Sequence, residues 1–412
     1  MKIVLVSIFF SKDRGGGSGI AYQQAVELQK RGHDVFVFTG TFDSDLGWQE
    51  ESSIKIYKIK NKNYRYITRS YLCLYNFRVQ KKFKKFLKEV NPDVVHFHNL
   101  YFHFPFSLMK IAKDYTNKVF FTAHDVMTFF SFKLNHFVTK KYNLQNINNI
   151  NYKISLKDQI KKGKKSFNPF RNFFIRHYLS YLKKIFSVSD ELKKSLEQNK
   201  IKNIKVINNG IDISKWSADM EEVERIRANK NLLNKKIILF AGRLSGLKGG
   251  EVVIKSMKEV AKDIPSAVLF VLGDKNDYTE KMKNFIKEAG LESNIILNGG
   301  VPRTEMKFYY ALTDIIIVPS VYLDPFPTIN LEAMACGKPV VATIFGGSKD
   351  AIKDEENGYV VNPLNIDLIS KKIIYLLKNP TKAEGMGKAG LDRVKEEFSS
   401  EKWINKILKF YS

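Results

Sequence analysis

The chain has 412 residues, 44% of them hydrophobic, and a formal net charge of +26 at pH 7. This length exceeds what one hydrophobic core usually serves, so we predict two domains of ordinary size. No apolar run reaches the roughly 20 residues that cross a bilayer, which argues against an integral membrane protein. The two cysteines lie far apart in the sequence, form no disulfide framework and favour a reducing cytoplasm.

The positive charge is concentrated in the first half of the chain. Residues 1–220 contain 39 Lys and Arg against 17 Asp and Glu, whereas residues 221–412 contain 29 against 25. Such asymmetry indicates an anionic partner, namely nucleic acid, an anionic membrane surface or a phosphorylated acceptor. A lysine-rich composition on a solvated face is the plainer interpretation. Because no nucleic-acid-binding module is recognisable, we expect no nucleic-acid partner.

The first half alternates strands with helices. The opening apolar run, Ile3–Ser7, is typical of a strand buried on both faces, and it leads into a glycine segment, Gly15-Gly16-Gly17. We predict helices over residues 19–31 and 69–90. Further strands are predicted at 34–39, 93–97, 119–122, 186–189 and 205–207. This alternation predicts a parallel, doubly wound sheet.

Residues 131–168 interrupt that rhythm with Lys, Asn, Phe and Tyr in no clean period. A helix is expected to begin at Asn168-Pro169, with an aromatic face that includes Phe170, Phe173 and Phe174. Two interpretations of the 60–90 and 131–185 segments stay open. They are either an acceptor-side surface that meets an anionic membrane or lipid diphosphate, or ordinary amphipathic helices with polar outer faces.

A second alternation begins after residue 212. Strands are predicted at 237–241, 268–272, 295–297, 315–319, 339–342 and 358–361, and the chain closes with an amphipathic helix. We therefore divide the chain into an N-terminal domain, 1–212, and a C-terminal domain that begins at residue 213. Open α/β sheets bind ligands at the carboxyl ends of their strands, so two such domains predict a ligand in the cleft between them.

The chemically informative residues of the second half lie at strand ends. Arg243 and Lys248 occupy a glycine-bearing loop that precedes a helix, a pattern that suits a diphosphate. Farther on, the acidic residues Asp324 and Glu332 are separated by seven residues, and Glu332 opens the string Glu-Ala-Met-Ala-Cys-Gly.

This acidic pair with its following string resembles the signature of family 4 of the retaining glycosyltransferases. The Arg243/Lys248 pair, the 209–212 string Asn-Gly-Ile-Asp and the N-terminal glycine segment match the family in order, and together the matches cover nearly the whole chain. The resemblance implies the α/β GT-B fold, with two facing Rossmann-like, doubly wound domains. It also implies a C-terminal crossover helix, 400–412, that joins the N-terminal domain and leaves 213–399 as the C-terminal domain. This sequence departs from the family pattern at Asp324, where Glu followed by x-Phe-Gly is usual. That departure leaves the identity of the donor sugar undecided.

The resemblance also implies a set of roles in the C-terminal domain. Glu332 would accept hydrogen bonds from the ribose hydroxyls, since a carboxylate accepts from two donors at once. Arg243 and Lys248 would hold the diphosphate, helped by the backbone N–H groups of Thr328 and Ile329 at a helix start. Asp324 would contact hydroxyls of the donor sugar. The nucleotide base is expected to stack near residues 300–302.

For the N-terminal domain the resemblance implies fewer contacts. The segment Gly15-Gly16-Gly17 would allow the backbone to approach the donor phosphates. His124 would lie against the donor sugar near the reacting carbon, and His98, at a strand end, would face the substrate. His96 is expected to be packed in the core. His96, His98 and His103 lack acidic or cysteine partners at ligand spacing, so we expect no metal site.

These expectations combine into one predicted activity. A nucleotide-diphosphate sugar donates its sugar, with retention and without metal or other cofactor, to a glycan or lipid-linked acceptor in cell-surface polysaccharide or glycoconjugate synthesis. We favour same-face attack, in which the departing phosphate takes the acceptor proton. The expected location is the cytoplasm, with a peripheral position on the inner face of the membrane as a further possibility.

Other functions that use the same two-domain architecture would show different sequence motifs. A nucleotide-sugar epimerase would lack the Glu-Ala-Met-Ala string, and a sugar phosphorylase would need a pyridoxal-binding lysine segment, which is not recognisable. A basic protein that binds nucleic acid or membrane is the remaining alternative; a nucleic-acid-binding protein would need a recognisable binding module, and none is visible.

Overall fold

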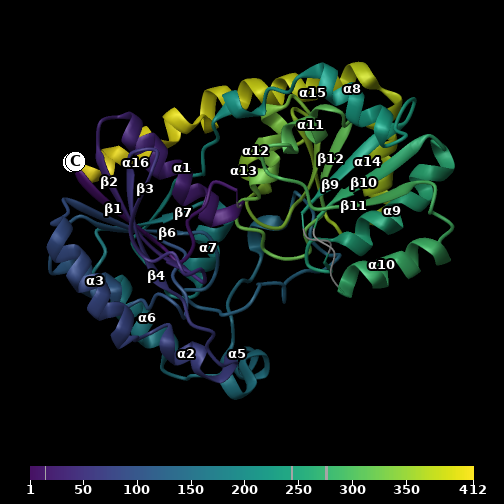
Figure 1. Ribbon diagram of the computed structural model, residues 1–412. Coiled ribbons are helices and arrows are strands. Elements are labelled where there is room, and N and C mark those ends of the chain that lie inside the picture. Colours follow the sequence, from purple (N-terminus) through teal and green to yellow (C-terminus); the bar gives the residue numbers. More distant parts are fainter. Residues whose placement is uncertain (14, 243–244, 274–276) are drawn as a thin grey trace. The chain divides into compact units, whose positions relative to one another are not determined.

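The computed structural model describes every residue of the chain except 14, 243–244 and 274–276. The chain divides into two compact units (Figure 1). Unit 1 comprises residues 1–134, 151–209 and 400–412, and unit 2 comprises residues 135–150 and 210–399.

Unit 1 is built on an eight-stranded sheet with the order β3-β4-β2-β1-β5-β6-β7-β8. All neighbouring strands pair in parallel except β3, which runs antiparallel to β4 at the edge. The strands β5 and β6 are buried along their whole length, as expected for a sheet covered on both faces. The strands are β1 (Lys2–Ser7), β2 (Asp34–Thr41), β3 (Gly47–Glu51), β4 (Ile54–Lys60), β5 (Val94–His98), β6 (Val119–Ala123), β7 (Lys184–Ser187) and β8 (Ile204–Val206).

Helices lie on both faces of this sheet (Figure 1). They are α1 (Gly16–Lys30), α2 (Arg69–Leu72), α3 (Phe77–Val90), α4 (Leu108–Lys113), α5 (Leu156–Gly163), α6 (Arg171–Leu179), α7 (Asp190–Gln198) and the terminal α16 (Ser400–Tyr411), with short 3₁₀ turns η1 (Tyr66–Thr68) and η3 (Lys164–Ser166). As predicted, the last helix joins the first unit. Trp403, Ile404 and Ile407 of α16 are buried in one hydrophobic cluster with residues of α1 and the sheet.

Two features of unit 1 differ from the sequence-based prediction. The predicted helix 69–90 is two helices, because Asn76 adopts an extended conformation and its side chain caps α3 by accepting from the Val79 N–H. The β3–β4 hairpin was not predicted. Its β3 strand is a half-exposed edge strand whose sequence carries no continuous apolar run.

Unit 2 contains a six-stranded, all-parallel sheet with the order β11-β10-β9-β12-β13-β14. The order reverses between β9 and β12, which makes this point the topological switch of the sheet. The strands are β9 (Lys236–Ala241), β10 (Ala267–Leu272), β11 (Ile295–Gly299), β12 (Ile315–Val318), β13 (Val340–Thr343) and β14 (Gly358–Val361). All six predicted strands are confirmed, with bounds that shift by one or two residues.

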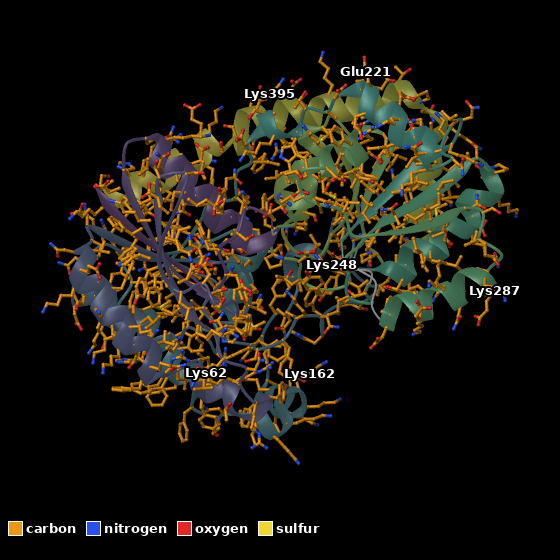
Figure 2. The ribbon with its side chains drawn as sticks, viewed as in Figure 1. Lys62, Lys162, Glu221, Lys248, Lys287 and Lys395 are labelled. Carbon is orange, nitrogen blue, oxygen red and sulfur yellow. The ribbon has the colours of Figure 1, made fainter. Side chains whose placement is uncertain are left out.

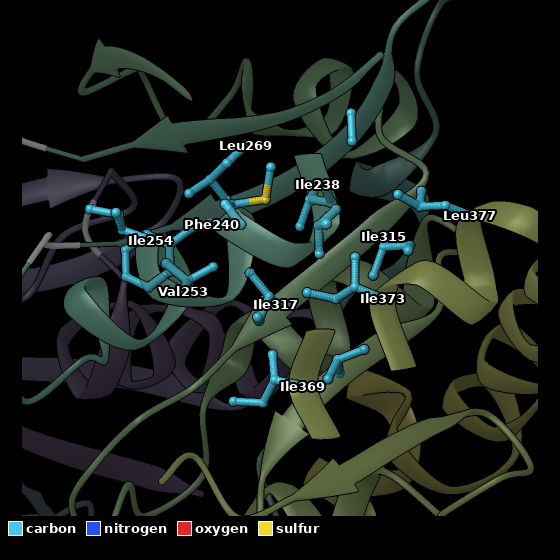
Figure 3. Packing of buried hydrophobic residues seen from close by; sticks show 14 of the residues in the cluster. Ile238, Phe240, Val253, Ile254, Leu269, Ile315, Ile317, Ile369, Ile373 and Leu377 are labelled. Carbon is cyan, nitrogen blue, oxygen red and sulfur yellow. The ribbon is translucent and has the colours of Figure 1, made fainter. Parts of the chain in front are cut away.

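The helices of unit 2 bury its core against both faces of the sheet. Figure 3 shows part of that packing, in which Val253 and Ile254 of α9 and Ile369 and Ile373 of α14 cluster with buried strand residues. The helical elements are α8 (Met220–Asn229), α9 (Gly250–Asp263), α10 (Asp277–Glu288), α11 (Met306–Ala311), α12 (Thr328–Ala335), α13 (Ser348–Ala351), α14 (Ile366–Lys378), α15 (Pro380–Arg393), the 3₁₀ turns η2 (Ile147–Asn149) and η4 (Ile213–Trp216), and the π-helical η5 (Val394–Phe398). The prediction of two Rossmann-like domains is thus confirmed.

The predicted domain division, 1–212 with 400–412 against 213–399, needs two corrections. The chain changes unit at residues 209–210, and residues 135–150 belong to unit 2 although they lie within the predicted first domain. The physical reason is packing and hydrogen bonding: the Phe137 ring contacts Phe345, and the Asn362 amide donates to the carbonyls of Thr139 and Tyr142. Periodicity does not reveal such contacts, since the segment has no regular period of its own.

Among the described residues, no helix is both long and apolar enough to cross a membrane.

Candidate functional site

The switch point of the unit 2 sheet brings two loops together. The loop after β9 and the loop after β12 are joined by the Val321 N–H, which donates to the Leu247 carbonyl at 2.8 Å. Gly249 has φ of +81°, and a Cβ atom there would lie 2.0 Å from the Pro319 carbonyl oxygen. A glycine is therefore required for this approach, which brings Lys248 up to the end of β12.

Lys248 and Asp324 form an ion pair across these loops. The Lys248 Nζ donates to Asp324 Oδ2 at 2.7 Å, and the Ser320 hydroxyl donates to the same oxygen at 2.8 Å. Burial lowers the pKa of Lys248, but Asp324 and Tyr322 outweigh that effect, so the net pKa is raised and the ammonium stays charged at physiological pH. Lys248, which is predicted to bind the diphosphate, and Asp324, which is predicted to bind the donor sugar, thus lie in direct contact. Arg243, the other predicted diphosphate ligand, lies outside the described residues.

A second glycine holds the backbone of Asp324 in place. Gly346 has φ of +102°, and a Cβ atom there would lie 2.0 Å from the Asp324 carbonyl oxygen. The same carbonyl accepts from the Gly347 N–H at 2.9 Å. Asp324 is only 4% exposed, so its carboxylate position is fixed by neighbours on two loops.

The helix α12 begins immediately after this loop. Pro327 occupies its N-cap without a side-chain capping hydrogen bond, and Thr328 and Ile329 are partly exposed in its first turn. The N-terminus of a helix carries unsatisfied N–H groups and a partial positive charge, which together favour an anion. The predicted backbone contacts of Thr328 and Ile329 with a phosphate therefore stay a prediction that this geometry permits.

Glu332 lies one turn farther along α12 and is buried. Its Oε1 accepts from Arg303 Nη2 at 2.8 Å, and its Oε2 accepts from the Tyr310 hydroxyl at 2.7 Å. Each carboxylate oxygen has a second lone-pair direction, so Glu332 retains capacity for two further donors such as ribose hydroxyls. The carboxylate is thereby oriented before any ligand arrives.

Sequence reasoning missed these partners of Glu332. Arg303 directly follows the 300–302 segment predicted to meet the base, and its guanidinium also lies over the Trp216 ring, 5.5 Å from the centroid. The only available signal was its position just after β11, at a strand end. Tyr310 gave no signal, because it reads as one apolar residue of a short helix.

In unit 1, the glycine segment is the first turn of a helix rather than a loop before one. Gly15 caps α1, and Gly16, with φ of +66°, opens it. A Cβ atom at Gly17 would lie 2.2 Å from the side-chain amide of Asn99, which follows β5. The glycine turn therefore lies against the carboxyl end of β5, at the switch point between β1 and β5.

Three histidines line up beside that point. The His98 Nδ1 lies 2.9 Å from His124 Nε2, and the His98 ring stacks on His96 with centroids 4.6 Å apart. His96 is fully buried, as predicted, and contacts Thr122 Oγ1 at 2.7 Å and the Tyr411 hydroxyl of α16. His98, predicted to face substrate, is also fully buried, because the rings on either side enclose it. Only His124 is partly exposed.

These histidines are neutral at physiological pH. Burial lowers the pKa of His124 to about 4, and burial together with His124 lowers that of His96 to about 3. Burial and then the two neighbouring histidines lower the pKa of His98 as well. A neutral imidazole donates from one nitrogen and accepts at the other, so this cluster can orient hydroxyls but holds no proton to deliver as an imidazolium.

Within the described ranges, no group of three or more His, Cys, Asp or Glu side chains could hold a metal ion.

Comparisons with known proteins fit this arrangement. A family model described as Glycosyltransferase Family 4 matches residues 14–215, and one described as Glycosyl transferases group 1 matches residues 222–393. A GDP-mannose-dependent alpha-(1-6)-phosphatidylinositol monomannoside mannosyltransferase of Mycolicibacterium smegmatis is 27% identical over 187 residues, which cover 44% of this chain and 49% of that protein. The chain spans about half the length of the curated relatives it matches.

Solved structures match over the full length. Sucrose-phosphate synthase from Thermosynechococcus elongatus superposes with a TM-score of 0.76 at 20% identity, covering 100% of this chain and 98% of that one. Anabaena HepE in complex with UDP superposes with a TM-score of 0.71 at 16% identity, covering 99% of each chain. At these identities the likeness concerns the fold, and the expected GT-B type of fold, with two Rossmann-like domains, is confirmed.

Proposed function

Since this chain belongs to glycosyltransferase family 4, we propose that it transfers a sugar from a nucleotide-diphosphate sugar to a glycan or lipid-linked acceptor. One similar protein depends on GDP-mannose and another binds UDP, and both ligands contain a nucleoside diphosphate. Unit 2 is the part of the chain whose chemistry suits that group.

The observation that carries the proposal is the arrangement of charge at the switch point of unit 2. A charged lysine, the open N-terminus of α12 and a preoriented buried carboxylate all lie on segments that follow strand ends of one sheet. A cation and a helix N-terminus suit a diphosphate, and a carboxylate with free lone pairs suits a ribose. In this assignment Lys248 exchanges part of its contact with Asp324 for a donor phosphate, and Asp324 turns to sugar hydroxyls.

We assign retention without metal to the reaction. The bond between the anomeric carbon and the phosphate oxygen breaks, the acceptor oxygen bonds to the same carbon from the same face, and its proton passes to the departing phosphate. Lys248 and the α12 N-terminus supply the positive charge that stabilises the leaving diphosphate. His124, being neutral, would hydrogen-bond the sugar rather than deliver a proton.

We assign binding of the acceptor to unit 1. Its basic composition supports an acceptor at or near an anionic surface, which fits synthesis of a cell-surface glycan or glycoconjugate at the cytoplasmic face of a membrane. Peripheral association is part of this proposal.

The test is release of nucleoside diphosphate from a panel of UDP, GDP and ADP sugars in the presence of EDTA. Wild type is compared with Glu332→Ala and with Glu288→Ala, a matched carboxylate on the exposed face of α10. Release from one donor that is lost only in Glu332→Ala supports the proposal and identifies the donor. Direct donor binding is measured in parallel, because an obligatory acceptor would suppress release. Absence of both release and binding for every donor would overturn the proposal.

A further inference from the structure

A cavity lies in unit 1, beyond the carboxyl ends of β5 and β6 and apart from the residues assigned to the donor. Its volume is about 280 Å³, near the lower end of small-molecule pockets. Its walls come from the segments that follow these two strands, from α2 with η1, and from the stretch between α5 and α6. Most of the lining is aromatic or aliphatic, for example Leu100, Phe102, Phe106, Phe129, Phe130 and Phe167.

A buried guanidinium lines the same cavity. Arg171 is only 8% exposed, and its two Nη atoms donate to Asn172 Oδ1 and to the carbonyl of Met127. Its Nε is buried without a hydrogen-bond partner. Among the residues that the structure describes, no Asp or Glu lines the cavity, and the hydrogen bonds of the Arg171 guanidinium go to neutral groups. Asp125 lies close enough to interact electrostatically: burial raises the pKa of its carboxyl, and Arg171 is among the groups that offset part of that rise. A buried cation that makes no direct hydrogen bond to a carboxylate is costly, and an anion bound to it in the cavity would lower that cost.

The rim of the cavity adds a second cation and an apolar border. Arg69 also lines the cavity, with its guanidinium 4.5 Å from the centroid of the Phe102 ring. Large apolar side chains are exposed around these segments, with Tyr66 49%, Leu156 60% and Phe170 65% exposed. Exposed apolar residues at a rim suit a ligand that brings its own hydrocarbon.

Lysines surround this border. The segment 157–165, which covers most of α5, contains five lysines and one aspartate. The turns η1 and η3 pack against each other, so this lysine segment and the Arg69 segment are neighbours. Figure 2 shows Lys62 and Lys162 at the same end of unit 1. The surroundings are therefore positive, while most of the cavity lining is apolar.

We propose that this cavity binds an amphiphile in which a phosphate group is joined to an apolar chain, with the phosphate on Arg171 and Arg69 and the chain against the phenylalanines. The inference rests on the proposed function in one respect: the amphiphile is the acceptor, or the lipid-linked part of it. The cavity supplies what such a molecule needs, since the charge of Arg171 is met by phosphate and the apolar wall is covered by hydrocarbon.

The binding test uses decyl phosphate, kept below its micelle concentration, and isothermal titration calorimetry on the full chain. Decanol and inorganic phosphate serve as half-ligands. We expect saturable binding of decyl phosphate and at least tenfold weaker binding of either half, which corresponds to about 1.4 kcal/mol. Vesicles with and without an anionic lipid distinguish a soluble ligand from one presented by a membrane.

Three variants locate the binding. Arg171→Met should weaken decyl phosphate at least tenfold, and Arg69→Met about threefold, because Arg69 is exposed and partly screened. Ser131→Trp, at the exposed rim, should block entry without disturbing the core. Arg65→Met is the matched control, since Arg65 is exposed in the same segment but does not line the cavity. Thermal unfolding identifies any variant that fails to fold, in which case Arg69→Met and Ser131→Trp decide the outcome.

Two results would overturn the inference. One is the absence of saturable decyl phosphate binding, even if the chain binds to vesicles. The other is binding that all three cavity variants leave unchanged or that Arg65→Met weakens equally. Neither readout depends on sugar transfer. Binding of decyl phosphate in a chain that binds no donor would therefore separate failure of the proposed function from failure of this inference.

Discussion

The contact between Lys248 and Asp324 leads to a sharp prediction, because the same ammonium is assigned to the leaving diphosphate. Lys248→Met removes the charge and keeps most of the side-chain length. The Lys248 side chain is 37% exposed and that of Asp324 is 6% exposed. Solvent screens such a pair, so we expect a loss of about 1 kcal/mol in the free energy of unfolding rather than the full value of a buried pair.

The loss in catalysis should be much larger than the loss in stability. A preorganised donor that stabilises developing charge contributes roughly 10²- to 10³-fold to kcat. A charge-assisted contact to a phosphate contributes about 1.5–3 kcal/mol, so the donor Kd should rise by tenfold or more. For a unit of about 200 residues, 1 kcal/mol lowers Tm by roughly 2–4 °C.

The assay measures three quantities for each variant: kcat for nucleoside diphosphate release, donor Kd by calorimetry, and Tm. The control is Lys255→Met, because Lys255 Nζ also donates to a carboxylate, Glu251, at 2.7 Å but on the exposed face of α9. Asp324→Asn and the double variant complete a double-mutant cycle. We expect the double variant to lose less stability than the sum of the losses in the two single variants. The reasoning would be refuted by a Lys248→Met variant with normal kcat and Kd, or by an equal effect of Lys255→Met.

Three further predictions follow from contacts in each unit. Tyr310→Phe removes a buried hydroxyl that donates to Glu332, and it should cost about 1–2 kcal/mol in urea unfolding and weaken donor binding; unchanged affinity would mean that Glu332 is not oriented by Tyr310. Tyr411→Phe removes the hydroxyl that contacts His96, and it should speed amide exchange in α16, with Lys409→Met as a surface control that leaves exchange unchanged. Stability should also fall in acid, because the lowered pKa of His124 means that the unfolded chain binds more protons below pH 6.5. The stabilising contribution of neutral His124 is complete above its unfolded pKa and is lost as pH falls toward about 4, with a loss of about 1.4 kcal/mol between pH 7.5 and 5.5. Unfolding of His124→Asn should depend less on pH in that range, and an identical pH dependence would contradict the assignment.

The apolar residues of unit 1 show why the partner of this unit is harder to predict than its fold. Strands such as β5 and β6 are continuous apolar runs, so hydrophobic period alone places them. The apolar residues of the 66–77 and 156–174 segments have the same composition as a core, yet many are exposed. Whether a phenylalanine faces a cavity, a core or solvent depends on what packs over it, and a single sequence does not contain that information.

The amino-acid sequence by itself determined the two Rossmann-like sheets and the family, because these depend on local period and on motifs at strand ends. The family resemblance in turn implied the return of the terminal helix to unit 1. Tertiary structure alone decided that Lys248 meets Asp324, that Arg303 and Tyr310 orient Glu332, and that His98 is enclosed between two rings. It also decided that residues 135–150 join unit 2. Each of these depends on distances between residues far apart in the chain, which are set by sheet order and by close approaches at glycines rather than by local sequence.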